Sequence, residues 1–383
     1  MNDISLDQVN RLVLCKQHLA VKSRTQDIVQ IVRDIGGLHA TNSTTPYLSL
    51  LARIMNFKKD CLDEELYVKR SLGKIRCIRG TLYILAKEMI PMAFAATKKM
   101  VEILSRRYAE FQGVPYEKYE EVSKSILKIL EGREMSASEI KKALRIQLNV
   151  SSILNLLCDQ GLLARSQPRR YSLFCEYFPD VDLAKMDETE AITQLVRYYL
   201  TAFGPVTESD ITWWTGLNKA GVQKALSNIQ EQTVKVEISG LSGNFIMLRS
   251  DESLVRTQAF SQEQTINLLP SLDPYLMGYK ERKRYLDHEH YCEVFDRSGN
   301  ATSAILIDGR VAGVWDFTEN SKPSVKLLLF EEIGADVLDK IYSEAQRVGE
   351  FMAGKEVQIK ECRSMVPLTH RTAGGVMSPL KGC

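Results

Sequence analysis

The sequence predicts an α+β fold that is mainly α, in which tandem winged-helix repeats precede a C-terminal mixed α/β domain. Two stretches predict the repeats, because the order helix, helix, helix, β-hairpin occurs over 118–178 and again over 187–250, as in a winged helix. A third observation predicts the last domain: Asp308-Gly309 lies between two apolar runs, which is a strong hairpin signal. We therefore expect four parts, 1–115, 116–182, 183–260 and 261–383.

The two complete repeats have clear helix boundaries. In the first, Ser136 and Glu139 have the spacing of a capping box, in which hydroxyl and carboxylate each bind a free amide of the helix start. Gly161 is placed to end the next helix, predicted over 150–160. Strands over 162–165 and 170–174 then form the wing. In the second repeat, helix 188–203 precedes two helices capped by Thr207 and Asn218, and strands follow over 233–238 and 244–248.

The first 115 residues and the last 120 have weaker patterns. A strand pair around Arg79-Gly80, within 74–85, makes the first 85 residues a possible third, degenerate copy. The helices expected in this part cover 5–20, 24–35, 45–56, 63–72 and 87–112. In the last part we expect strands over 267–269, 303–306, 311–315 and 325–330, and a helix over 335–352.

Composition limits the classes of function. The net charge is +2, from 50 basic and 48 acidic residues in a chain of 383, so a nucleic-acid surface must come from local clusters of charge. The eight cysteines form no C-x-x-C pair and no zinc spacing. We interpret them as small core residues in a reducing compartment, and expect no metal and no cofactor. No apolar run approaches the roughly 20 residues that span a bilayer, so we expect a cytoplasmic protein without a membrane partner.

One short link combines two groups that can handle a water molecule. His39 and Thr41 lie in the stretch Gly36 to Asn42, between two predicted helices. Because they are two residues apart, an extended backbone would point both side chains to one face. The alternative is an ordinary helix–helix turn with an incidental histidine.

Basic residues gather in two places. The wing of the first repeat carries Arg165, Arg169 and Arg170, whereas the helix at 150–160 is poor in basic residues. The densest run lies between Tyr279 and Tyr285 and consists of Lys280, Arg282, Lys283 and Arg284, with Glu281 among them. Cations beside aromatic rings suit phosphate contact and base stacking; the alternative is a solvated charged loop.

Two further motifs have both a structural and a functional interpretation. Asp273 precedes Pro274 and Tyr275 after a short strand, so its carboxylate either caps a turn or orients a water or a basic side chain. In the functional interpretation we expect Tyr275 to support Asp273. Trp213-Trp214 ends a short helix, and we expect this pair to pack in the core because aromatic pairs bury large areas.

Five motifs in order resemble a known family. They are LHATNSTTPYLSLLAR, IRGTLYIL, DITWWTGL, LLPSLDPYLMGYKERKRYL and ILIDGRVAGVW, and together they look like the AlkZ/YcaQ-type family of tandem winged-helix DNA glycosylases. The resemblance extends over nearly the whole chain. It implies excision of N7-alkylated purines, including bases in interstrand crosslinks. In the family, Gln-x-Gln or Gln-x-Asp holds the catalytic water; here His39 and Thr41 occupy these two positions.

The resemblance leads to one main hypothesis and two alternatives. In the main hypothesis the protein is a monofunctional DNA glycosylase, a monomer at the nucleoid that acts on double-stranded DNA with alkylated bases. A neutral His39 accepts a proton from water and Thr41 positions it. The phosphates are held by Arg79, Arg165, Arg169, Arg170, Lys280, Arg282, Lys283 and Arg284. The first alternative is a lesion-recognition or regulatory DNA-binding protein without turnover, and the second is a protein-interaction module.

Overall fold

The computed structural model describes residues 4–256, 263–370 and 380–383. Small sheets alternate with helices along most of the chain, and a five-stranded sheet follows near its end. The predicted α+β class is therefore confirmed. Most of the predicted elements are present, with ends that differ by a few residues; the helix expected over 45–56, for example, ends at Leu51.

The N-terminal unit is a winged helix, preceded by one further helix. Its three-stranded antiparallel sheet has the order β1-β3-β2, the same arrangement that the middle unit has. The elements are α1 (Leu6–Lys16), α2 (Ile28–Asp34), β1 (Leu38–His39), α3 (Thr45–Leu51), α4 (Lys59–Asp63) with a π-helical turn (Glu64–Val68), β2 (Leu72–Arg76) and β3 (Leu82–Ala86). The 3₁₀ turn Ile78–Gly80 joins β2 to β3. The third copy expected at the start of the chain is thus present.

The middle unit follows the long helix α5 (Ile90–Phe111). Its sheet has the order β4-β6-β5, and the capping box of Ser136 and Glu139 is present as predicted. The elements are α6 (Tyr116–Ile129), β4 (Met135–Ser136), α7 (Ala137–Leu144), α8 (Val150–Asp159), β5 (Leu163–Gln167), β6 (Arg170–Leu173) and α9 (Phe174–Tyr177). This unit has a hydrophobic core of its own, which includes Ile126, Ile153 and Leu157.

The third winged helix repeats this order. Thr207 and Asn218 cap its second and third helices, as the sequence predicts. The elements are α10 (Glu188–Phe203), α11 (Glu208–Thr215), α12 (Lys219–Asn228), β7 (Thr233–Val236), β8 (Phe245–Leu248) and α13 (Arg249–Arg256). A β-bridge between Val206 and Ile246 takes the place of a third strand.

The C-terminal domain is built on a five-stranded sheet in the order β13-β12-β11-β10-β9. Strands β12 and β13 are parallel, and the other neighbours are antiparallel. The elements are β9 (Ile266–Leu269), α14 (Pro274–Met277), α15 (Tyr291–Val294), β10 (Ala304–Ile307), β11 (Arg310–Thr318), β12 (Ser324–Leu329), α16 (Ala335–Ala353), β13 (Gln358–Glu361), β14 (Ser364–Met365) and β15 (Leu380–Lys381). The Asp308-Gly309 hairpin is confirmed by the pairing of β10 with β11.

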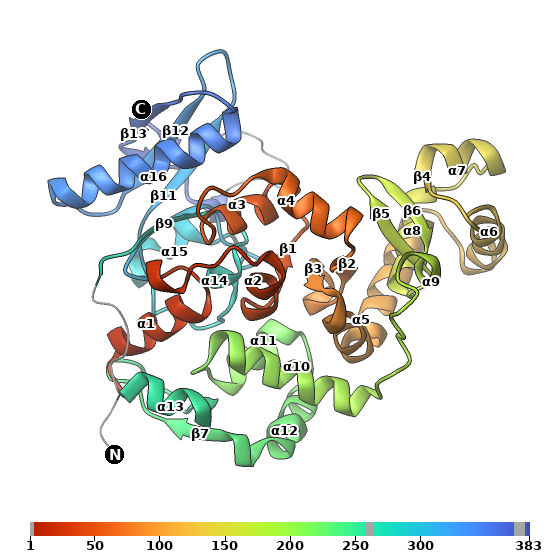
Figure 1. Cartoon of the computed structure of the whole chain (residues 1–383), viewed down its shortest axis with the longest axis horizontal. Helices are drawn as coiled ribbons and strands as arrows, with labels where there is room; N and C mark the ends of the chain where they lie inside the picture. Colours follow the sequence, from red (N-terminus) through yellow and green to blue (C-terminus); the bar gives the residue numbers. More distant parts are fainter. Residues whose placement is uncertain (1–3, 257–262, 371–379) are drawn as a thin grey trace.

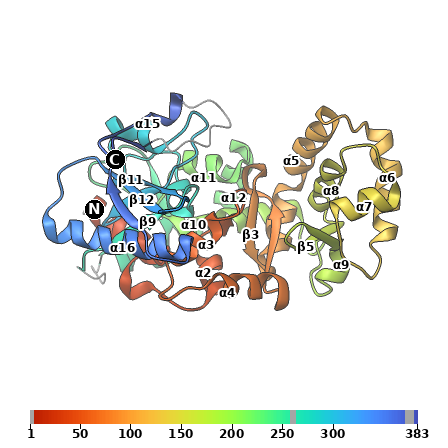
Figure 2. The same ribbon diagram turned by 90° about the horizontal axis from the view of Figure 1, so that it is seen from above.

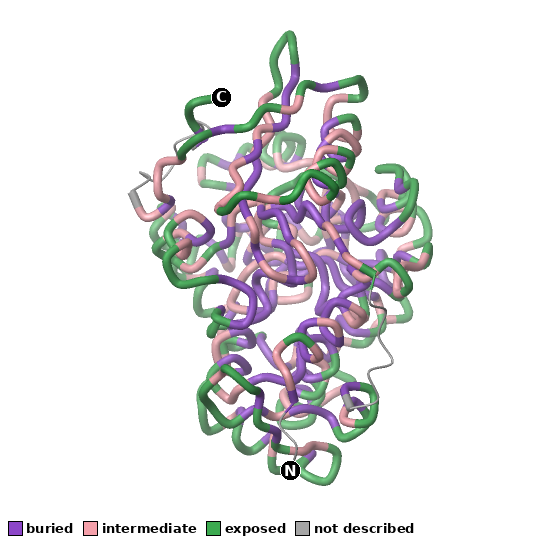
Figure 3. Tube along the Cα trace, turned by 90° about the vertical axis from the view of Figure 1, so that its left-hand side faces the viewer, coloured by how far each residue is buried: buried purple, intermediate pink, exposed green. Residues whose placement is uncertain are grey.

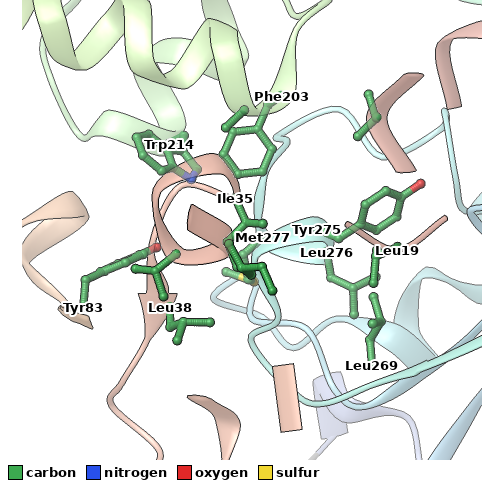
Figure 4. Close-up of a cluster of buried hydrophobic side chains, with 14 of the residues drawn as sticks. Leu19, Ile35, Leu38, Tyr83, Phe203, Trp214, Leu269, Tyr275, Leu276 and Met277 are labelled. Carbon is green, nitrogen blue, oxygen red and sulfur yellow. The ribbon is translucent and has the colours of Figure 1, made fainter. Parts of the chain in front are cut away.

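The middle unit stands apart from the other three parts of the protein. Figures 1 and 2 show the middle unit projecting from one end, whereas the N-terminal and third units and the C-terminal domain lie together. These three share one continuous core, and buried segments fill the centre of the body in Figure 3. In Figure 4, Phe203 and Trp214 of the third unit meet Ile35 of the N-terminal unit and Met277 of the C-terminal domain. Trp214 is in the core as predicted, but its neighbour Trp213 is only half-buried.

The cysteines differ in part from the expectation. Cys77 and Cys158 are core residues, but Cys61, Cys175 and Cys292 are exposed. Cys362, just before β14, and Cys383, just after β15, form a disulfide beside this strand pair. The scattered spacing of the cysteines could not predict this pairing. The interpretation of all eight as core residues is therefore wrong.

Candidate active site

The link that carries His39 begins as an edge strand. Strand β1 pairs only with β3, so that Leu38 lies opposite Ile84 and His39 opposite Tyr83. Gly37 before it has φ +84°, and a Cβ there would lie 2.5 Å from Leu85, so the chain needs glycine at this point. After Ala40, whose N–H donates to Leu82 (2.8 Å), the chain bends through residues 41–44 into α3.

His39 is held in a nearly dry position. It is 4% exposed, and its ring lies 5.3 Å from that of Tyr83. Nδ1 is buried without a hydrogen-bond partner among the described residues. Burial, and after it the positive charge of Arg79, together lower the pKa of His39 to about 4. The imidazole is therefore neutral at physiological pH.

Arg79 brings a positive charge and an aromatic ring close to this neutral imidazole. It occupies the turn between β2 and β3 with φ +50°, and its guanidinium lies 4.1 Å from the ring centre of Trp213. Arg282 lies 5.3 Å from the same ring. Burial lowers the pKa of Arg79, and Arg79 forms no ion pair within the described residues. One cluster thus contains His39, Tyr83, Arg79 and Trp213.

Thr41 belongs to a different surface. It is exposed and lines a cavity of about 720 Å³. The cavity is also lined by Ala40, Leu82 and Ile84, whereas His39 and its cross-strand neighbour Tyr83 are not in its wall. The expectation that His39 and Thr41 share one face is therefore wrong, because the extended backbone ends at Ala40 and the chain bends at Thr41. Two residues of fully extended chain span at most about 7 Å, so the α-carbons of His39 and Thr41 still lie within that distance of each other.

The wing arginines differ in availability. Arg169 is exposed at the turn of the wing and lines the same cavity as Thr41. Arg165 donates to the Asn155 side chain (3.0 Å), and Arg170 donates to the Glu134 carbonyl (2.7 Å) and pairs with Glu139. Arg169 is therefore the one of these three wing arginines that lies in the wall of the cavity of Thr41, whereas Arg165 and Arg170 support the wing.

The basic run of the C-terminal domain alternates between solvent and interior. Lys280 and Lys283 are exposed, and Lys280 lines a hollow beside Trp213. Arg282 is buried; it donates to the Tyr291 hydroxyl (2.7 Å) and the Gly299 carbonyl (2.8 Å). Arg284 is 2% exposed and donates to the Pro205 carbonyl (3.0 Å). The expectation that all four hold phosphates needs correction, because Arg282 and Arg284 are committed to internal acceptors.

Asp273 and Tyr275 have structural positions. Asp273 caps α14 by accepting from the Tyr275 amide (3.0 Å), as one of its two interpretations predicts. Its carboxylate also accepts two hydrogen bonds from Arg53, and both side chains are fully buried. The Tyr275 hydroxyl donates to the Gly309 carbonyl (2.7 Å). Asp273 thus caps a turn and also holds a basic side chain, Arg53, as its second interpretation predicts. The supporting role of Asp273 and Tyr275 in the chemistry stays a prediction.

Two expectations concern ligands and membranes. Within residues 4–256, 263–370 and 380–383, no group of three or more His, Cys, Asp or Glu side chains is arranged to hold a metal ion. None of the helices in these ranges is both long enough and apolar enough to cross a bilayer.

Sequence reasoning missed several residues around the site. Tyr83 was only part of a predicted strand, and Trp213 was assigned to the core. The cavity residues Tyr47, Asp63, Tyr67 and Lys74 gave no signal, because they come from two helices, a π-helical turn and a strand that meet only in the fold. The strand pairing that places Tyr83 opposite His39 would have identified Tyr83, but this pairing cannot be seen in a single sequence.

Three comparisons relate this chain to known proteins. The family model described as "DNA glycosylase AlkZ-like" matches residues 32–351. The "Interstrand DNA cross-link repair glycosylase" of Streptomyces sahachiroi is 25% identical over 269 residues, which cover 65% of this chain and 71% of that protein. The solved structure of Streptomyces sahachiroi DNA glycosylase AlkZ superimposes with a TM-score of 0.76 at 21% identity, over 94% of this chain and 100% of the other.

Proposed function

This chain belongs to the DNA glycosylase AlkZ-like family, and from its DNA glycosylase function we propose that it hydrolyses the N-glycosidic bond of N7-alkylated purines in duplex DNA. An N7-alkylated purine is already cationic and is a good leaving group. The enzyme therefore needs mainly to place a water and to tolerate positive charge on the sugar. Crosslinked purines are included among the substrates, since the similar Streptomyces protein is named for crosslink repair.

His39 is the proposed water-activating residue. The observation that carries this role is the lowered pKa of about 4, which keeps the imidazole neutral. A ring that is neutral before the reaction accepts a hydrogen bond from the water and takes its proton only as the new carbon–oxygen bond forms. A ring that is already protonated could do neither, and its charge would oppose the developing positive charge on the sugar. Thr41 supplies a hydroxyl from the cavity side of the link, and we propose that the water lies at the end of β1, where the chain turns from the surface of His39 to that of Thr41.

The proposed DNA contacts follow from which cations are available. Arg79, whose charge acts on His39, and Arg169, which lines the cavity of Thr41, are the proposed phosphate ligands nearest to the reacting nucleotide. Lys280 and Lys283 extend the contact over the C-terminal domain. Arg165 and Arg170 act through the wing that carries Arg169. The protein is proposed to act as a monomer in the cytoplasm, at the nucleoid.

The test is release of free base by the purified full-length protein. We expect 7-methylguanine to appear from methylated duplex faster than its spontaneous loss, and a crosslinked duplex to be unhooked. Mass spectrometry of the released base identifies the product. A rate equal to spontaneous loss on every duplex would exclude the proposed function.

A second candidate is lesion recognition without turnover. The observation that favours it is the 4% exposure of His39, together with the separation of His39 from the cavity of Thr41. This candidate predicts tight, salt-sensitive binding to alkylated duplex and no base release. The same assay distinguishes the two candidates.

A further inference from the structure

The cavity beside Thr41 is formed where three parts of the protein meet. Its wall combines the N-terminal unit with the wing of the middle unit, through Arg169, and with the C-terminal domain, through Phe317 and Phe351. Its volume of about 720 Å³ is within the range of sites that hold a drug-sized molecule, about 300–1,000 Å³. A nucleobase carrying a substituent is a ligand of this size class.

Four aromatic side chains lie in the wall. Tyr47 and Tyr67 come from the N-terminal unit, and Phe317 and Phe351 come from the C-terminal domain. Enzymes that act on a base commonly hold the extruded base by stacking it against such side chains. The wall therefore suits a flat heterocycle better than it suits a sugar or a phosphate.

The polar groups of the wall have a defined arrangement. The Tyr47 hydroxyl donates to Asp63 Oδ1 (2.6 Å), and Lys74 Nζ donates to the Tyr67 hydroxyl. A carboxylate oxygen accepts more than one hydrogen bond, so Asp63 retains acceptor capacity toward the cavity. Guanine presents two adjacent donors, N1–H and the exocyclic amine, whereas adenine presents a donor beside an acceptor.

We propose that this cavity is the binding site of the extruded guanine, with Asp63 accepting from its N1–H and its exocyclic amine. This inference rests on the proposed function, and it names the base that the site selects. The sugar remains at the rim beside Thr41, within reach of the link that carries His39. Arg169 at the same rim holds a flanking phosphate. A substituent on N7 occupies the remaining space between the aromatic rings.

The main test is a change of base selectivity. The variant Asp63→Asn keeps an acceptor for the Tyr47 hydroxyl but replaces one acceptor by an amide donor, which matches adenine better than guanine. We expect the ratio of 7-methylguanine to 7-methyladenine release from methylated duplex to fall about tenfold or more. The matched control is Glu64→Gln, since Glu64 is the next residue, is exposed, pairs with Lys69 alone within the described residues and is not in the wall.

A second arm does not depend on turnover. Free 7-methylguanine is titrated into the full-length protein by calorimetry, with the wild type, Asp63→Asn, Glu64→Gln and Ser43→Trp. Ser43 is exposed and lines the cavity, so that a tryptophan would fill it without disturbing a buried residue. We expect the wild type and Glu64→Gln to bind the base, and the other two to bind at least tenfold more weakly.

The outcomes separate this inference from the proposed function. If the wild type releases 7-methylguanine but the ratio is unchanged in Asp63→Asn and the rate is unchanged in Ser43→Trp, the inference is wrong and the proposed function stands. If no base is released from any duplex, the proposed function is wrong, and the titration alone decides whether the cavity takes guanine. Equal binding by wild type and Ser43→Trp would overturn the inference in either case.

Discussion

Arg53 and Asp273, 220 residues apart in the chain, form a fully buried ion pair with two hydrogen bonds of 2.8 and 2.9 Å. Arg53 follows α3, and Asp273 begins α14. The pair therefore joins the N-terminal unit, which carries His39, to the C-terminal domain. Arg53 also donates to the carbonyls of Gln17 and Ser49, so each of its nitrogens has an acceptor.

Removal of one partner of this pair should destabilise the fold. Asp273→Ala leaves the Arg53 charge buried without its carboxylate, and we expect a loss of about 3–5 kcal/mol in the free energy of unfolding. Urea denaturation measures this loss. Asp287→Ala is the control, because it breaks a half-exposed pair with Arg310 and should cost about 1 kcal/mol or less. Similar losses in the two variants would contradict the structural role of Asp273.

The buried imidazole should make stability depend on pH. The folded pKa of His39 is about 4, whereas the ordinary value is 6.5, so the unfolded chain takes up the proton first as the pH falls. The stability from the neutral ring is full above about pH 6.5 and is lost between about 6.5 and 4. The wild type should therefore lose roughly 3 kcal/mol relative to His39→Gln over this range. Denaturation at pH 7.5, 5.5 and 4 measures the difference, and a constant difference would show that His39 is not buried neutral.

Substitution of Arg169, in the wing, and of Arg284, which is buried, should have different effects on duplex binding. Arg169 is exposed beside Thr41, so Arg169→Ala should weaken duplex binding and reduce the slope of log affinity against log salt by about 0.9. Arg284→Ala should lower the stability of the fold and leave that slope unchanged, because its guanidinium serves the Pro205 carbonyl and packs 3.9 Å from the ring centre of Tyr279. Fluorescence anisotropy over a salt series measures both slopes. An equal reduction in the two variants would mean that Arg284 reaches the DNA.

Local signals predicted much of the fold, because helix caps and hairpin turns act over a few residues. The caps at Ser136, Thr207 and Asn218 and the hairpin at Asp308 are examples. Long-range relations were not predictable in this way. The partner of Asp273 is Arg53, which follows a distant helix, and the internal acceptors of Arg282 and Arg284 exist only in the folded protein. A basic run in the sequence therefore could not show which of its members face the solvent.

The location of the candidate site stays a prediction, and its geometry differs from the one that the sequence predicts. The link at 39–41 was identified by its residue types and by the resemblance to the family. Strand β1 has only two residues, so the assumption of an extended backbone failed at Thr41. The cavity of Thr41 is assembled from three units and could not be foreseen, and the neutrality of His39 depends on burial that periodicity does not report.

The most direct test of the account is the single-turnover rate of 7-methylguanine release at pH 7.5 by wild type and His39→Ala. We expect His39→Ala to lose about 100-fold or more in rate, since general-base catalysis contributes about that much, while it binds the same duplex with unchanged affinity. His39→Gln, which restores the residue that the resemblance implies for this position, should retain most of the rate. A wild-type rate no faster than spontaneous loss, or an undiminished rate in His39→Ala, would contradict the central claim that a neutral imidazole at the edge of β1 activates the water.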